Sequence, residues 1–171
     1  MPTRCDWCTG DPLMEAYHDD EWGVRTDDDT ALFELLTLEV FQAGLSWRSV
    51  LVRRRAFRDA FVGFNVERVS QFDDADVARL MQDAGIIRNR KKIESTIENA
   101  RIVRNLQLEH GSFARWLDSL PNGDLANYQQ VFRSTFRFCG PEITRMFVMG
   151  CGRVPAPHDP HCETGAVDSP P

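Results

Sequence analysis

A carboxylate, an amide and an indole lie close together around one predicted helix joint, and such groups suit the recognition of a flat, polar ring. Glu39 falls inside an apolar run, where an ionised side chain is costly unless a cation or a hydrogen-bond donor meets it. Gly44 is suited to end this helix, and Ser46 can cap a second helix that begins at Trp47. The joint thereby gathers Glu39, Gln42 and Trp47, which predicts a pocket for a flat, polar or cationic ring.

Cysteine and histidine residues at the two ends of the chain form a second set of chemically active groups. They are Cys5, Cys8, His18, His158, His161 and Cys162. Four such ligands in a closed set suit a structural, tetrahedral Zn²⁺. Five cysteines in a cytoplasmic chain of this size favour free thiols and metal ligation over disulfides. Spacing alone favours Cys5 and Cys8 with two of the last three residues, so it leaves the ligand set open.

Length and composition indicate one small domain. The 171 residues are enough for a single domain with a substantial core. No apolar run approaches the ~20 residues that span a bilayer. The first residues lack the apolar segment of a signal peptide, so we expect a cytoplasmic protein with no membrane partner.

The net charge of −6 is distributed unevenly along the chain. Residues 1–44 carry 2 basic and 11 acidic side chains, whereas residues 45–104 carry 13 basic and 8 acidic ones. The positive charge peaks at residues 53–55 and 88–92. A solvated helix face is the simpler interpretation of either cluster by itself. For the second cluster, a DNA-binding role is favoured more strongly, because the cluster lies on a predicted hairpin.

Hydrophobic periodicity predicts helices and no strands. An acidic, loop-rich segment, 1–29, should precede an amphipathic helix that runs from residue 47 to residue 61. Gly85, with the capacity for a left-handed conformation, should end one helix before a long basic helix begins near residue 90. This helix–hairpin–helix pattern, at about 74–108, is one that points N–H donors at a phosphate. Further helices are expected at 66–72, 113–120, 125–138 and 142–150.

The motifs resemble those of the DNA-3-methyladenine glycosylase I family, in the helix–hairpin–helix glycosylase superfamily. The resemblance rests on residues 17–23 (YHDDEWG), 38–47 (LEVFQAGLSW), 82–90 (QDAGIIRNR) and the pair His158 and Cys162. It implies an all-α helical bundle, with a zinc site that ties the N- and C-terminal segments together. The single domain would cover residues 1–162, with clamped termini at 1–29 and 151–162 and a disordered tail at 163–171.

The same resemblance implies functional residues, partners and a cofactor. The expected partner is double-stranded alkylated DNA, bound by a monomer, and the expected cofactor is structural Zn²⁺. The implied catalytic residues are Glu39 and Tyr17. The implied base-binding residues are Trp47, Trp22, Trp7 and Gln42. The implied DNA-binding residues are Leu45, Gly85, Ile86, Arg88, Arg90 and Lys91. The implied zinc ligands are Cys5, His18, His158 and Cys162, with Cys8 and His161 as alternates.

The implied reaction is monofunctional hydrolysis of the N-glycosidic bond of 3-methyladenine after the damaged nucleotide flips out of the duplex. Methylation at N3 makes the adenine cationic and therefore a good leaving group. Residues 84–117 contain no aspartate, whereas related superfamily members use one downstream of the hairpin. An enzyme that acts on so activated a leaving group can do without this aspartate.

Two other functions fit parts of the sequence. A bifunctional glycosylase/lyase would use Lys91 or Lys92 to form a Schiff base with the abasic sugar. A non-catalytic, zinc-stabilised DNA-binding module would need no pocket, and the cost of burying Glu39 argues against it.

The chain also departs from the family pattern in the segment 121–138, which is shorter than usual, and at the positions Val40 and 144–149.

Overall fold

The computed structural model describes residues 1–164, and these form helices joined by short connections, with no strand among them. The predicted all-α class is therefore confirmed. The elements are α1 (Pro12–Asp20), α2 (Asp29–Gln42), α3 (Trp47–Leu51), α4 (Arg54–Ala60), η1 (Val62–Phe64, a 3₁₀ turn), α5 (Val66–Ser70), α6 (Asp74–Met81), α7 (Arg90–His110), α8 (Phe113–Ser119), α9 (Leu125–Thr135) and α10 (Pro141–Gly150).

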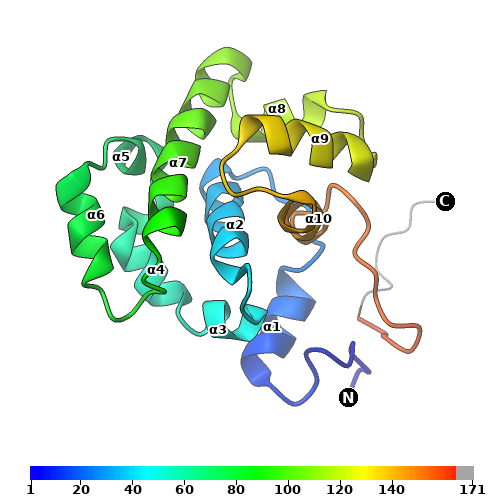
Figure 1. The fold of residues 1–171 in the computed structure, drawn as a ribbon. Helices are drawn as coiled ribbons and strands as arrows, with labels where there is room; N and C mark the ends of the chain where they lie inside the picture. The colour runs from blue at the N-terminus through cyan, green and yellow to red at the C-terminus, as the bar shows by residue number, and fades with distance from the viewer. Residues whose placement is uncertain (165–171) are drawn as a thin grey trace.

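Helix α2 is the centre of the bundle, with α7 on one side and α10 on the other (Figure 1). Asp28 caps its first turn by accepting hydrogen bonds from the amides of Thr30 and Ala31. Apolar side chains surround α2 instead of following one stripe, as expected of a helix buried on all sides. Its fully buried apolar residues are Leu32, Phe33, Leu36, Leu38, Val40 and Phe41.

The joint between α2 and α3 forms as the sequence predicts. Gly44 has a φ of +79°, a left-handed conformation that glycine adopts at little cost. Ser46 then caps α3 by accepting a hydrogen bond from the amide of Ser49. The side chain of Lys92, on α7, completes the joint. Its ammonium donates to the carbonyl oxygens of Phe41 at 2.9 Å and Ala43 at 2.7 Å, which satisfies acceptors left free at the end of α2.

Three local predictions were wrong. The amphipathic helix expected over 47–61 is interrupted at residues 52–53, and the break lets α3 and α4 bury their apolar faces separately. The acidic segment 1–29 contains α1, capped by Asp11 and begun by Pro12. Gly85 is not left-handed, and α6 already ends at Met81. Gly85 is instead fixed by packing, since a Cβ there would lie 2.9 Å from the Cβ of Ala56.

The N-terminal segment and the last residues that the structure describes lie side by side. The amide of Glu163 donates to the carbonyl of Thr3 at 2.8 Å, and the amide of Thr3 donates back to the carboxylate of Glu163. Residues 165–171, most of the predicted disordered tail, lie outside the described residues. None of the described helices combines the length and apolar character that crossing a membrane requires.

We predict that Lys92→Met destabilises the protein by roughly 2–4 kcal/mol, because it leaves the carbonyls of Phe41 and Ala43 without their charged donor. Urea unfolding followed by circular dichroism measures the change. Lys91→Met is the matched control, since Lys91 is exposed and its loss should cost less than about 0.5 kcal/mol. Equal stability of the two variants would show that the Lys92 ammonium contributes nothing to the joint.

Candidate active site and metal cluster

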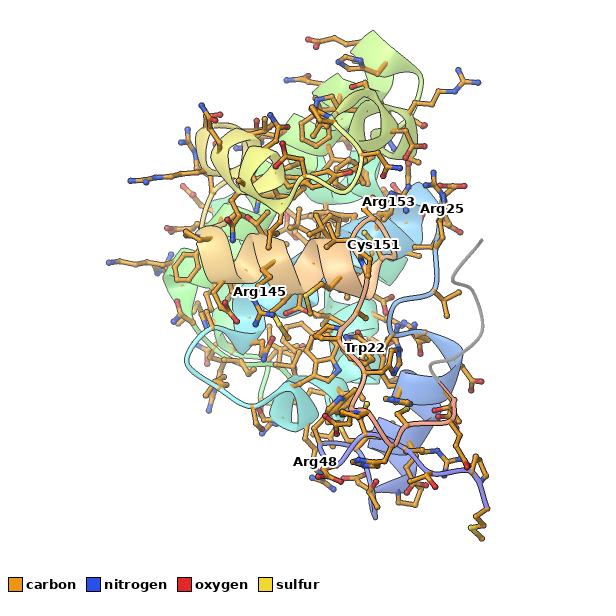
Figure 2. The ribbon with its side chains drawn as sticks, turned by 90° about the vertical axis from the view of Figure 1, so that its right-hand side faces the viewer. Trp22, Arg25, Arg48, Arg145, Cys151 and Arg153 are labelled. Carbon is orange, nitrogen blue, oxygen red and sulfur yellow. The ribbon has the colours of Figure 1, made fainter. Side chains whose placement is uncertain are left out.

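A cavity of about 350 Å³ opens between α1, the α2–α3 joint and α10. Apolar and aromatic side chains form most of its wall, and few polar groups face it, as in most small-molecule sites. In Figure 2, Trp22 lies below α10 on the side from which Arg145 projects. The cavity is lined by Trp7, Met14, Tyr17, Trp22, Glu39, Trp47, Arg145, Met146, Met149 and Pro157.

Glu39 and Trp47 each present a buried polar atom without a partner in the described part of the chain. Glu39 is only 2% exposed, and its Oε2 makes no hydrogen bond. The indole Nε1 of Trp47 is likewise buried and unpaired. A buried polar group without a partner costs free energy, so the two atoms are set to bind something that enters the cavity.

The environment of Glu39 favours its neutral form in the empty cavity. Burial, with a smaller contribution from the charge of Glu142, raises the pKa of Glu39 to about 8, while the charge of Arg145 acts in the opposite direction. The carboxyl group is therefore largely protonated at neutral pH. A cation in the cavity would favour the carboxylate, because an opposite charge at close range lowers the pKa of an acid.

Aromatic rings line the rest of the cavity wall. The rings of Tyr17 and Trp47 lie 5.1 Å apart and are inclined by 49°. Tyr17 is buried on α1, and burial raises the pKa of its hydroxyl well above the usual value, so it remains a hydrogen-bond donor at neutral pH. Trp7 and Trp22 pack edge to face at 5.0 Å. Such walls suit a flat ring that stacks on one side.

Cys5, His18, His158 and Cys162 meet beside this cavity, with their ligand atoms all within 4.8 Å of one another. The Sγ of Cys162 lies 3.6 Å from the Nε2 of His18 and 3.5 Å from the Nδ1 of His158. The other ring nitrogen of His18 contacts the carboxylate of Asp19 at 2.9 Å, an arrangement typical of metal-binding histidines. These four residues could hold a metal ion.

The two alternate ligands lie outside this group. Cys8 is buried, and its thiol donates to the carbonyl of Cys5 at 3.2 Å. His161 is exposed and pairs with Asp6 at 3.2 Å. The geometry therefore favours the set implied by the family resemblance over the set favoured by cysteine spacing.

The predicted DNA-binding residues lie on two neighbouring surface features. Leu45, which is 45% exposed, lies on the α2–α3 joint. Arg88, Arg90 and Lys91 are exposed around the start of α7. The side chain of Ile86 is buried in the core, so this residue can offer DNA only its main chain.

Two further residues of the hairpin region already form hydrogen bonds within the protein. The amide of Gly85 donates to the side chain of Asp83 at 2.8 Å, so this predicted phosphate donor is satisfied internally. Lys92 was a candidate for Schiff-base chemistry, and burial lowers its pKa in the direction such chemistry needs. Its amine is nevertheless held inside the α2–α3 joint, where it cannot reach a sugar.

The first basic cluster supports the fold. Arg54 of this cluster bridges Glu21 and Glu34, and Arg58, which follows it on α4, also binds Glu34. Gln42, predicted to bind the base, is absent from the cavity wall.

Sequence reasoning missed five residues of the cavity wall. The run 144–149 departs from the family pattern, and that departure is the signal that could have identified three of them. The missed residues are Met14, Arg145, Met146, Met149 and Pro157.

Comparison with known proteins agrees with this geometry. A family model described as methyladenine glycosylase matches residues 7–134. DNA-3-methyladenine glycosylase 1 of Escherichia coli (strain K12) is 38% identical over 170 residues, which cover 88% of this chain and 91% of the relative.

Solved structures are similar over nearly the whole chain. A crystal structure of 3-methyladenine DNA glycosylase I has a TM-score of 0.85 and 36% identity, covering 94% of this chain and 98% of its own. The 3-methyladenine DNA glycosylase I of Staphylococcus aureus, solved to explain 3-methyladenine recognition, has a TM-score of 0.84 and 30% identity, covering 95% of this chain and 96% of its own. The chain therefore belongs to the methyladenine glycosylase family.

Proposed function

We propose that this protein is a DNA base-excision repair enzyme that hydrolyses the N-glycosidic bond of 3-methyladenine in alkylated DNA without cleaving the backbone. The observation that carries the proposal is the unpaired, buried carboxyl group of Glu39 in a cavity lined by Tyr17 and Trp47. That cavity has the polarity and the aromatic walls that a cationic purine requires. The relatives named above, all 3-methyladenine glycosylases, support the same activity.

Recognition of the base depends on charge at the floor of the cavity. The cationic ring favours the Glu39 carboxylate, which accepts a hydrogen bond from the adenine amino group. Such a charged hydrogen bond contributes on the order of 1.5–3 kcal/mol, and stacking on Trp47 adds roughly 1–3 kcal/mol. Normal adenine is neutral and leaves Glu39 protonated, so the charged hydrogen bond does not form and the base is bound less well. Tyr17, whose ring lies next to that of Trp47 in the cavity wall, donates a further hydrogen bond.

DNA is held by groups outside the cavity. The α6–α7 pair acts as a helix–hairpin–helix, in which Arg88, Arg90 and Lys91 face the phosphate backbone. The damaged nucleotide rotates out of the stack, and the exposed Leu45 fills the gap that it leaves. Because methylation has already activated the leaving group, water can complete the hydrolysis with little help from proton transfer.

The Cys/His cluster is proposed to hold structural zinc through Cys5, His18, His158 and Cys162. Two thiols and two imidazoles are the donor set of many tetrahedral zinc sites. The bound ion would supply no chemistry to the reaction. It would tie the N-terminal segment to the C-terminal one, where few aliphatic side chains are available for packing.

Glu39→Gln should lower the release of 3-methyladenine and weaken binding of the free cationic base by roughly tenfold or more, since it removes the charge and keeps the shape. Base release is measured by separating the bases freed from methylated duplex DNA. Trp47→Ala is the comparison variant, because it should weaken the binding of neutral and cationic rings alike. Undiminished release by folded Glu39→Gln protein would exclude the proposed recognition.

The same substitution should stabilise the free protein at alkaline pH. An unfolded glutamate titrates near 4.5 and folded Glu39 near 8, so the wild type loses stability as the pH rises between these values. Glutamine does not ionise, so the variant does not pay the free energy of a buried charge as the pH rises. The variant should match the wild type near pH 5 and exceed it near pH 8, by an amount on the order of a few kcal/mol. A variant that is less stable at both pH values would indicate that Glu39 supports the fold.

Purified protein should contain about one zinc ion per chain, and Cys162→Ala should lose both the zinc and stability. Elemental analysis and thermal unfolding provide the two measurements. Cys8→Ser is the matched control, because Cys8 is buried nearby but lies outside the cluster. Loss of zinc from Cys8→Ser, with retention in His18→Ala, would overturn the ligand assignment.

The double substitution Arg88→Ala with Lys91→Ala should weaken binding to damaged and undamaged duplexes about equally and reduce the salt dependence. Arg115→Ala is the control, since α8 follows the far end of α7, away from the hairpin (Figure 1). Titrations at several salt concentrations measure both effects. A loss confined to damaged DNA would contradict a role in gripping phosphates.

A further inference from the structure

Arg145 has a position in the cavity that binding of the base does not explain. Among the described residues that line the cavity, it is the only one with a positive charge. Its side chain is 35% exposed, whereas Glu39 is almost completely buried. The guanidinium therefore lies towards the open end of the cavity and the carboxyl group at its floor. Figure 2 shows Arg145 projecting from α10 on the side where Trp22 lies.

A guanidinium in this wall repels a cationic base, so it needs another reason to be there. In the free protein, Glu142 offsets its charge. The two side chains form paired contacts of 2.5 and 3.0 Å one turn apart on α10. Glu142 is 70% exposed, and an ion pair in so exposed a place is weak and easily exchanged.

Sulfur atoms hold the arginine beside the cavity. The guanidinium lies 3.5 Å from the Sδ of Met149 and 3.7 Å from the Sδ of Met146. Both methionines also line the cavity. Their flexible, polarisable side chains accommodate small shifts of the arginine. Arg145 can thus change its partner without leaving the rim.

The substrate itself supplies an anion at this place. A base that enters the cavity still attached to DNA leaves its sugar and phosphates at the open end. Arginine binds phosphate through two parallel hydrogen bonds, a geometry that few other side chains offer. We propose that Arg145 binds a phosphate of the extruded nucleotide and exchanges Glu142 for it when DNA binds. This inference rests on the proposed glycosylase function and names a further positioning residue for it.

The experiment compares three ligands: free 3-methyladenine, a duplex with one abasic site, and the same duplex intact. Arg145→Gln should weaken binding to the abasic duplex by roughly tenfold or more and reduce its salt slope by about one. Binding of the free base, followed by tryptophan fluorescence, should stay unchanged or become tighter. Binding to the intact duplex should be unaffected, because no nucleotide enters the cavity.

Glu142→Gln provides the opposite change. It frees Arg145 from its partner and removes a negative charge near the DNA, so it should tighten binding to the abasic duplex, most clearly at low salt. Arg145→Lys should be intermediate, since it keeps the charge and loses the two-pronged geometry. Arg115→Gln, on α8, is the matched control for removal of an arginine charge elsewhere. Melting temperatures verify that each variant is folded.

Several results would overturn the inference. Equal weakening of the free base and the abasic duplex by Arg145→Gln would mean that the arginine contacts the base. No change with either ligand would mean that the arginine has no role in binding. A wild type that releases no 3-methyladenine from methylated duplex DNA would refute the proposed function as well, and this control is measured before any variant is compared. A normal wild type with unresponsive variants refutes only the role of Arg145.

Discussion

The burial of one carboxyl group without a partner, that of Glu39, is the constraint on which the rest of the structure depends. Such a group can be kept dry only on a helix that is covered on all sides, and α2 is covered by α7, α8, α10 and the α3–η1 region. The aromatic packing of Phe33, Phe41 and Phe57 around α2 supplies the hydrophobic free energy that offsets the cost. Stability is thus lowered locally at the position where the proposed ligand supplies the missing charge.

The end of α2 connects this floor to the surface proposed to contact DNA. Lys92 belongs to α7, the helix that follows the basic hairpin, yet its ammonium binds carbonyls on both sides of Gln42. The exposed Leu45 follows Gly44 within the same joint. Hydrogen bonds therefore connect the hairpin helix directly to the joint and to the end of the helix that carries the cavity floor. A phosphate held at the start of α7 then fixes the distance from the DNA backbone to the cavity.

Much of this arrangement could be predicted from local chemistry, and the rest depends on contacts distant in the sequence. The Gly44 turn, the Ser46 cap and the cost of Glu39 each follow from one residue and its neighbours. The break at residues 52–53 and the packing of Gly85 on Ala56 depend on which helices meet, and periodicity does not contain that information. The cap of α1, Asp11 with Pro12, was a readable local signal. It was missed because acidic composition suggested a loop.

The cavity and the Cys/His cluster share walls, so the position of one depends on the other. Trp22 contacts both His18, with ring centroids 5.6 Å apart, and His158, at 4.7 Å, while it also lines the cavity. A metal ion bound by this cluster, as proposed, would therefore position an aromatic wall as well as the two end segments. Along the cavity, the acidic group lies at the floor and the cationic group at the rim. A nucleotide with a cationic base and an anionic phosphate has the complementary order of charge. An undamaged nucleotide would match only the rim, so under the proposed function Glu39 would discriminate between the two.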